Sequence, residues 1–160
     1  VTGGADPARR GELAVLLGGT DDAVERLRPV LAIYSSVIVH TGPFGSGMAA
    51  KHAVQTVLMG KVAAAYEGLL LAQRAGVDPT TLATVVQHAE DQSGIHAFYL
   101  DAKSRAMAHG ADDTWRAVSA HQQPITVKDL DAALALADAV GLELPVTRGA
   151  RATVPDVWSA

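Results

Sequence analysis

Cysteine is absent from this 160-residue sequence, and aromatic residues make up only 4% of it. The absence of cysteine excludes disulfides, zinc–thiolate sites and thiol catalysis from this sequence. The composition is compatible with a reducing compartment, and a cytoplasmic location is therefore expected.

A run of basic residues is also lacking. The 13 lysines and arginines are outnumbered by 17 acidic residues, which gives a formal net charge of -4. Binding to nucleic acid has little electrostatic support in such a sequence, so no nucleic-acid partner is expected.

The sequence has no long uninterrupted hydrophobic run. Its most apolar segment, residues 53–72, is interrupted by Gln55, Lys61 and Glu67. We expect a buried helix there rather than a membrane span, and hence no membrane partner. Residues 1–4 contain neither an initiator methionine nor the start of a signal peptide, so we expect that the chain begins inside a larger protein.

The first part of the chain has the pattern of a β-α-β segment. An apolar run at residues 12–17 lies between glycines and predicts a strand. Thr20, followed by two aspartates, predicts the start of a helix that ends near Ala32. The β-branched stretch at residues 37–40 predicts a second strand, and residues 2–7 have the composition of a turn.

From residue 46 onward the pattern is helical. Good helix formers run almost unbroken from Ser46, the expected N-cap, to Arg74, and Gly76 stands where a helix commonly ends. At 1.5 Å per residue this helix is about 40 Å long, and its small apolar side chains suggest burial by other helices or by a second subunit. Further helices are expected from Asp78 to about His88, across residues 95–107 and from the capping box at Thr126 to Gly141, with a loop at residues 109–114 and a partly helical tail.

A glycine-rich stretch, residues 42–51 (GPFGSGMAAK), joins the second strand to the long helix. Its GSGMAA part matches the dinucleotide fingerprint G-x-G-x-x-A, with Glu67 about 20 residues further on. That fingerprint requires the acidic residue at the end of a second parallel strand, whereas Glu67 falls within the predicted helix. We therefore interpret the match as a tight turn.

Lys51 lies near the start of the long helix, where the helix dipole favours anions rather than cations. A surface lysine is the simplest interpretation. However, Gln55 lies one turn later on the same face, and Lys128 is expected at another helix start. Neighbouring positive charge favours the neutral form of a lysine, which can then act as a general acid or base.

The six histidines do not pair at the spacing of metal ligands on a helix. No G-x-S-x-G nucleophile motif is present either. We therefore predict no metal site and no serine-based catalytic site.

Taken together, these motifs resemble the β-hydroxyacid dehydrogenases, which include 3-hydroxyisobutyrate dehydrogenase and are related to 6-phosphogluconate dehydrogenase. The resemblance covers nearly the whole chain and rests on motifs in a fixed order: Thr2-Gly3-Gly4, the strand from Gly11 to Gly19, the GPFGSGMAAK stretch, AQRAGVDP at residues 72–79, and Lys128-Asp129-Leu130.

The resemblance implies a mainly α fold in which residues 1–44 are the last strands of a Rossmann domain, whose remainder is missing, and residues 45–160 form a helical substrate-binding and homodimerisation domain. It implies that Lys51 is the general acid/base while hydride passes between NAD or NADP and a small 3-hydroxy acid or semialdehyde. It further implies that Thr2, Gly3 and Gly4 bind the substrate carboxylate, that Gln55 stands at a substrate-binding position, and that Lys128 contacts the cofactor. The chain alone is then expected to be inactive.

Three departures from the family pattern bear on the substrate. Gln55 stands where the family has an asparagine, and Val54 replaces the asparagine before it; Thr2 replaces a serine. The longer amide shifts its polar atoms by about 1 Å, which is enough to change substrate geometry. Two alternatives therefore remain: a non-catalytic dimerisation or ligand-binding module of the same fold, and a relative of the imine reductases.

Overall fold

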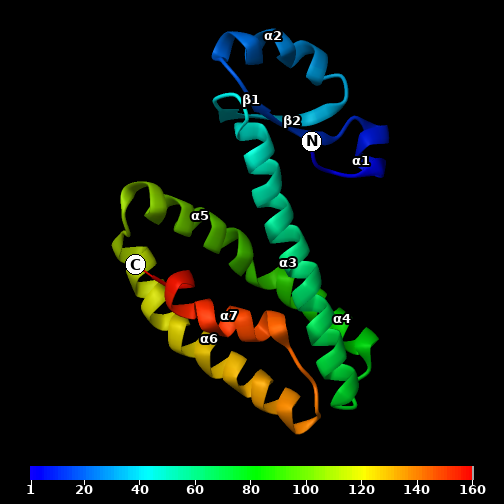
Figure 1. Cartoon of the computed structure of the whole chain (residues 1–160), viewed down its shortest axis with the longest axis vertical. Coiled ribbons are helices and arrows are strands. Elements are labelled where there is room, and N and C mark those ends of the chain that lie inside the picture. The colour runs from blue at the N-terminus through cyan, green and yellow to red at the C-terminus, as the bar shows by residue number, and fades with distance from the viewer. Residues whose placement is uncertain (160) are drawn as a thin grey trace. The chain divides into compact units, whose positions relative to one another are not determined.

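The computed structural model describes residues 1–159, apart from the side chain of Ser93. Ala160, the last residue of the predicted helical domain, lies outside the described residues. The elements in chain order are α1 (Ala5–Arg10), β1 (Leu13–Gly18), α2 (Asp21–Leu31), β2 (Ser35–Gly42), α3 (Ser46–Arg74), α4 (Pro79–Ser93), α5 (Ile95–His109), α6 (Asp113–Ala139) and α7 (Pro145–Val157), as Figure 1 shows. They form two compact units, Val1–Lys61 and Val62–Ala160, and α3 contributes to both.

The first unit contains the predicted β-α-β segment. β1 and β2 pair in parallel, with Val15 opposite Ile38, and β2 is longer at both ends than the predicted stretch. α2 connects them. Thr20, the residue before α2, is its N-cap, because the Thr20 hydroxyl accepts a hydrogen bond from the amide of Ala23. Val15 and Val24 are buried where α2 covers the strands.

The turn predicted at residues 2–7 is shorter than expected, because α1 begins at Ala5. Gly4 adopts a φ of 84°, a conformation open to glycine, and this lets the chain turn directly into the helix. Pro7 lies in the first turn of α1, where its missing amide hydrogen costs no helical bond. Asp6 and Pro7, which predicted a turn, thus lie in the first turn of α1.

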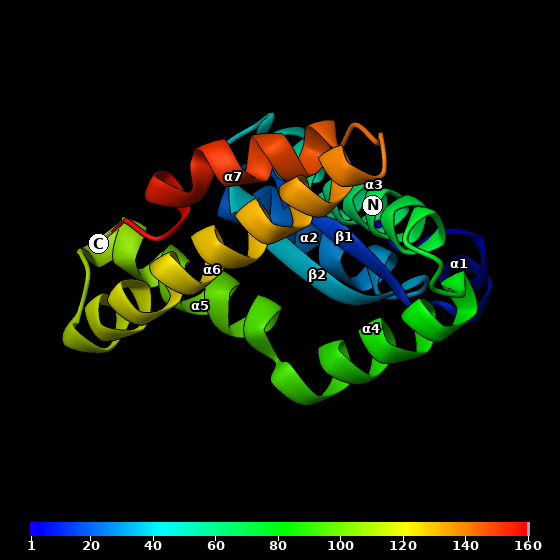
Figure 2. The ribbon, with the colours of Figure 1, turned by 90° about the horizontal axis from the view of Figure 1, so that it is seen from below.

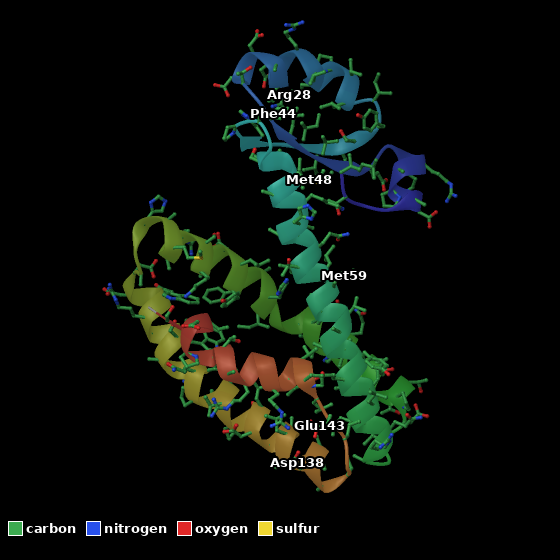
Figure 3. All side chains as sticks on the ribbon, viewed as in Figure 1. Arg28, Phe44, Met48, Met59, Asp138 and Glu143 are labelled. Carbon is green, nitrogen blue, oxygen red and sulfur yellow. The ribbon has the colours of Figure 1, made fainter. Side chains whose placement is uncertain are left out.

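α3 is one continuous helix of 29 residues and ends as predicted, with Gly76 at a φ of 80°. Only Glu67 and Ala72 of α3 are buried, so the expected burial by other helices of this chain is not observed. Burial by a second subunit stays a prediction. Met59, Val62 and Tyr66 are each more than half exposed. Figure 3 shows the side chains along this helix, with Met48 and Met59 labelled.

α4 and α5 follow the sequence expectation in type. Asp78 caps α4 by accepting hydrogen bonds from the amides of Thr80 and Thr81, but the helix continues to Ser93 rather than ending near His88. α5 spans the predicted segment and extends it to His109.

α6 differs from its prediction in where it begins. The helix starts at Asp113, after the N-cap Asp112, so the loop expected at residues 109–114 is reduced to a few residues. Thr126 and Lys128 therefore lie in the middle of α6 and not at a helix start. The Thr126 hydroxyl donates a hydrogen bond to the carbonyl of Gln122, four residues earlier. The hydroxyl thus finds its acceptor inside α6 and does not cap the start of another helix.

The core of the second unit gathers around two tryptophans. Trp115 of α6 stacks on Trp158, which follows α7, with ring centroids 5.9 Å apart, and Tyr99 of α5 contacts both rings. Figure 2 shows α6 and α7 running alongside each other. Lys103 of α5 donates hydrogen bonds to the carbonyl oxygens of Asp156 and Ser159 and so holds the end of α7 in place.

The start of α7 is held by a buried carboxylate. Glu67 is 4% exposed, and its two oxygens accept hydrogen bonds from the amides of Val146 and Thr147 at 2.6 and 2.8 Å and from the Thr147 hydroxyl at 2.7 Å. These amides belong to the first turn of α7, where a helix leaves donors without intrahelical partners. Glu67 therefore caps α7 from α3.

None of the helices in the described part of the chain combines the length and hydropathy that a membrane span requires.

Candidate active site

A pocket of about 510 Å³ opens on the first compact unit. It is lined by Val1, Thr2, Gly3, Gly4, Ala8, Leu13, Lys51, Gln55 and Leu58. Of the six residues that the sequence assigned to the site, all but Lys128 line this pocket. They come from two segments, residues 2–4 and 51–55, that lie almost fifty positions apart in the sequence.

One wall is the segment from Thr2 to Gly4. The amide and carbonyl of Thr2 both pair with Ala14 of β1, at 2.8 and 3.0 Å, as an antiparallel bridge. Gly3 and Gly4 follow with φ angles of 136° and 84°. Their amides donate to no acceptor within residues 1–159, so they remain available to an anion in the pocket.

The other wall is the first part of α3. Lys51 and Gln55 are four residues apart and therefore lie on one face of the helix, and Leu58 follows on the same side. Lys51 is half-buried and forms no ion pair with any carboxylate of the described chain. Its ammonium is thus the one side-chain cation lining the pocket.

The helix start differs in detail from the sequence expectation. Ser46 is the first residue of α3, and its hydroxyl lies 2.8 Å from that of Thr41 rather than capping an amide of the first turn. Gly45, with a φ of 93°, accepts from the amides of Met48 and Ala49 through its carbonyl. Lys51 is consequently the sixth residue of the helix.

Lys128, the sixth residue singled out, is not among the residues that line the pocket. It belongs to α6 in the second compact unit, its side chain is 73% exposed, and its ammonium lies 3.1 Å from the carboxylate of Asp129. Its assigned contact with the cofactor stays a prediction.

Four lining residues were not foreseen from the sequence: Val1, Ala8, Leu13 and Leu58. Leu58 could have been found, because it lies seven residues after Lys51 and so two turns along the same face. Ala8 could not, because the helix that carries it was read as a turn. These residues give the pocket apolar surface beside its polar groups.

The pocket combines one cation, one amide side chain, one hydroxyl and two free backbone amides with an apolar surface. This set suits a small molecule that carries a carboxylate and a second oxygen. No group of three or more histidine, aspartate or glutamate side chains able to hold a metal occurs in the part of the chain that the structure describes. His40 lies elsewhere, with its Nε2 atom 2.8 Å from the carbonyl oxygen of Gly19.

The fold defines the class of protein. The structure has two parallel strands near the N-terminus, followed by a series of helices, as the sequence predicted. The matches to two family models support this division. Residues 1–42 match the NAD binding domain of 6-phosphogluconate dehydrogenase. Residues 45–158 match the family described as the NAD-binding of NADP-dependent 3-hydroxyisobutyrate dehydrogenase. The chain therefore belongs to the 3-hydroxyisobutyrate dehydrogenase-like family, within the 6-phosphogluconate dehydrogenase superfamily, and the predicted family and fold class are confirmed.

Individual relatives are similar over nearly the whole chain. A 2-hydroxy-3-oxopropionate reductase of Escherichia coli is 31% identical, over 92% of this chain and 47% of its own length. A 3-hydroxyisobutyrate dehydrogenase of Pseudomonas aeruginosa is 32% identical, over 94% of this chain and 50% of its own. The crystal structure of a protein from Mycobacterium avium 104 classed as an oxidoreductase superposes with a TM-score of 0.81 at 31% identity, covering 98% of this chain and 56% of that one. The chain thus spans about half the length of the curated relatives it matches.

Proposed function

We propose that this chain is the C-terminal portion of an NAD(P)-dependent oxidoreductase that transfers hydride between the nicotinamide cofactor and a small 3-hydroxy acid or semialdehyde. The observation that carries the proposal is the pocket that brings Lys51 and Gln55 of α3 together with Thr2, Gly3 and Gly4. Membership of the 3-hydroxyisobutyrate dehydrogenase-like family supports the reaction class.

In this proposal Lys51 carries the proton. When an aldehyde is reduced, the ammonium of Lys51 donates a proton to the carbonyl oxygen; when an alcohol is oxidised, the neutral amine accepts the hydroxyl proton. Bound NAD or NADP supplies the hydride chemistry. Lys51 suits this role because it is half-buried, faces the pocket and has no competing carboxylate partner within the described residues.

The substrate carboxylate is assigned to the opposite wall. The amides of Gly3 and Gly4 and the hydroxyl of Thr2 are donors there, and the amide of Gln55 is a further donor on the side of Lys51. Holding the carboxylate at one wall fixes the distance of the reacting oxygen from Lys51, which is how positioning lowers a barrier. The longer side chain of Gln55 bears on which substrate fits.

The described residues do not form a cradle for the cofactor's pyrophosphate. In the G-x-G-x-x-A stretch, the space beside Gly47 is taken by β1, since a Cβ there would lie 2.6 Å from the carbonyl oxygen of Leu16. We therefore propose that the missing part of the Rossmann domain binds the dinucleotide, with Lys128 as the contact from this chain. We also propose that the boundary between the nucleotide-binding and helical domains lies between residues 44 and 45, close to where the two family matches meet. A cytoplasmic location is part of the same proposal.

The reaction is tested with the protein carrying its complete nucleotide-binding domain. Hydride transfer is followed by NAD(P)H absorbance with a panel of 3-hydroxy acids and semialdehydes, and the 160-residue chain serves as the control. We expect turnover of at least one substrate by the complete protein and none by the control. Absence of turnover together with absence of NAD(P)H binding would instead support the non-catalytic module. The presence of Val54 and Gln55 in place of the family's two asparagines favours that alternative. Turnover of cyclic imines alone would support the imine reductase relative.

We also propose that the chain forms a homodimer through α3. Met59, Val62 and Tyr66 are 55%, 61% and 61% exposed on this helix, and such apolar surface is commonly covered in an assembly. We expect sedimentation of the protein as a dimer and of the Val62→Glu/Tyr66→Glu variant as a monomer. Sedimentation of the unmodified protein only as a monomer at high concentration would refute the dimer.

A further inference from the structure

The start of α3 packs backbone to backbone against β1. A Cβ atom on Gly47 would lie 2.6 Å from the carbonyl oxygen of Leu16 and 3.2 Å from the amide nitrogen of Gly18. A Cβ atom on Gly18 would lie 2.7 Å from the carbonyl oxygen of Pro43 and 3.0 Å from the amide nitrogen of Gly47. Most of these neighbours are main-chain atoms, which cannot rotate away, so the helix and the strand approach this closely only because both positions are glycine.

This contact connects the elements that carry the two walls of the pocket. Gly47 precedes Lys51 by one turn of α3 and Gln55 by two, so the position of the helix start fixes both side chains. On the other side, Gly18 ends β1, and the same strand carries Ala14, which pairs with Thr2. Thus each wall of the pocket is joined to the contact by one regular element.

We propose that the Gly18–Gly47 contact sets the distance of Lys51 from the Thr2–Gly4 segment, and that Gly18 and Gly47 are therefore positioning residues for proton transfer. This inference rests on the proposed function. It replaces the interpretation of GSGMAA as a mere tight turn. The second glycine of a dinucleotide fingerprint lets the backbone approach a pyrophosphate, whereas Gly47 at that position lets the backbone of α3 approach β1.

The turn before α3 reinforces the contact. Ser46 Oγ lies 2.8 Å from Thr41 Oγ1, which joins the end of β2 to the first residue of α3. The same Ser46 oxygen lies 2.7 Å from the Cβ site of Gly18. The hydroxyl pair therefore sits directly against the contact and helps to hold the helix start on the strand.

The test is Gly47→Ala in the protein with its complete nucleotide-binding domain. Restoring a normal contact with Leu16 requires α3 to move from β1 by about 1 Å, and a misplacement of that size costs about 100-fold in activity. Gly60→Ala is the matched control, because Gly60 lies on the same helix with no atom within 4 Å of its Cβ site. We expect kcat/KM to fall about 100-fold for Gly47→Ala and to stay unchanged for Gly60→Ala; equal values for the two variants would overturn the inference.

A double-mutant cycle separates positioning from a loss of stability. If the contact acts through Lys51, Gly47→Ala should lower the residual activity of a Lys51→Ala protein by much less than it lowers that of the unmodified protein. An equal loss in both backgrounds overturns the inference. Should Gly47→Ala fail to fold, Ser46→Ala replaces it in the test, because it removes the hydroxyl and adds no atoms. We expect Ser46→Ala to lower kcat/KM several-fold in the unmodified protein and by much less in the Lys51→Ala protein. Full activity of Ser46→Ala overturns the inference.

A crystal structure of Gly47→Ala gives a readout that does not depend on activity. We expect Lys51 displaced relative to Thr2–Gly4, and an unchanged separation contradicts the positioning claim. If the unmodified protein shows no turnover while this displacement is seen, the proposed function fails and the geometric claim stands.

Discussion

Lys51→Ala is expected to lower kcat about 100- to 10,000-fold in the protein with its complete nucleotide-binding domain, which is the range for loss of a general acid or base. The reason is that Lys51 is the one side-chain cation on the wall of the pocket. Steady-state kinetics with the preferred substrate measures the effect. Lys61→Ala is the matched control, because Lys61 belongs to the same helix but does not line the pocket.

Lys51→Arg separates the charge of this residue from its proton transfer. Arginine keeps the positive charge but cannot give up its proton near neutral pH. We expect kcat to fall in the same range as for Lys51→Ala, while KM changes little because the cation is retained. Full activity of either variant would remove Lys51 from the mechanism.

The second large effect is expected at Glu67, in the stability of the protein. Glu67→Ala leaves two amides of the first turn of α7 and the Thr147 hydroxyl without their buried acceptor. Hydrogen bonds to a charged group and the cost of unsatisfied buried donors together predict a loss of about 3 kcal/mol. Urea unfolding measures it, and Glu143→Gln is the control: Glu143 is an exposed acid, labelled in Figure 3, whose replacement should have little effect.

The stabilisation by Glu67 should also depend on pH. Burial by itself raises the pKa of the Glu67 carboxyl, but hydrogen bonds from the Thr147 hydroxyl and from the amides of Val146 and Thr147 outweigh burial and hold the pKa below its ordinary value of 4.5. A depressed pKa in the folded state means that the charged carboxylate stabilises fully above that ordinary value and that this stabilisation is lost as the pH falls through the folded-state pKa. The difference in unfolding free energy between the unmodified protein and Glu67→Gln should therefore be constant near neutral pH and shrink in acid. A difference that does not change with pH would contradict the role of the carboxylate charge.

The sequence was sufficient where structure depends on neighbours along the chain. Glycines around the apolar run of β1, the Thr20 and Asp78 caps, and the end of α3 before Gly76 are all local patterns, and each was predicted. The grouping of Lys51 with Thr2–Gly4 was foreseen through the family resemblance, which places distant motifs in one site.

The sequence was insufficient where the partner is far away along the chain. Thr126 matched a capping box, yet its hydroxyl bonds within α6 and also accepts a hydrogen bond from Trp158, 32 residues later. The capping role of Glu67 was not predicted, because its partners are about 80 residues away along the chain. Gly47 likewise meets Leu16, which no local pattern indicates.

The most direct test of the proposed mechanism is a crystal structure of the complete protein with its cofactor and a small 3-hydroxy acid that it oxidises. The decisive distance joins Lys51 Nζ to the 3-hydroxyl oxygen of the substrate. We expect about 2.6–3.2 Å, the range for direct proton transfer, with the substrate carboxylate at the amides of Gly3 and Gly4. A substrate bound outside the pocket, or one whose hydroxyl is out of reach of Lys51, would contradict the mechanism.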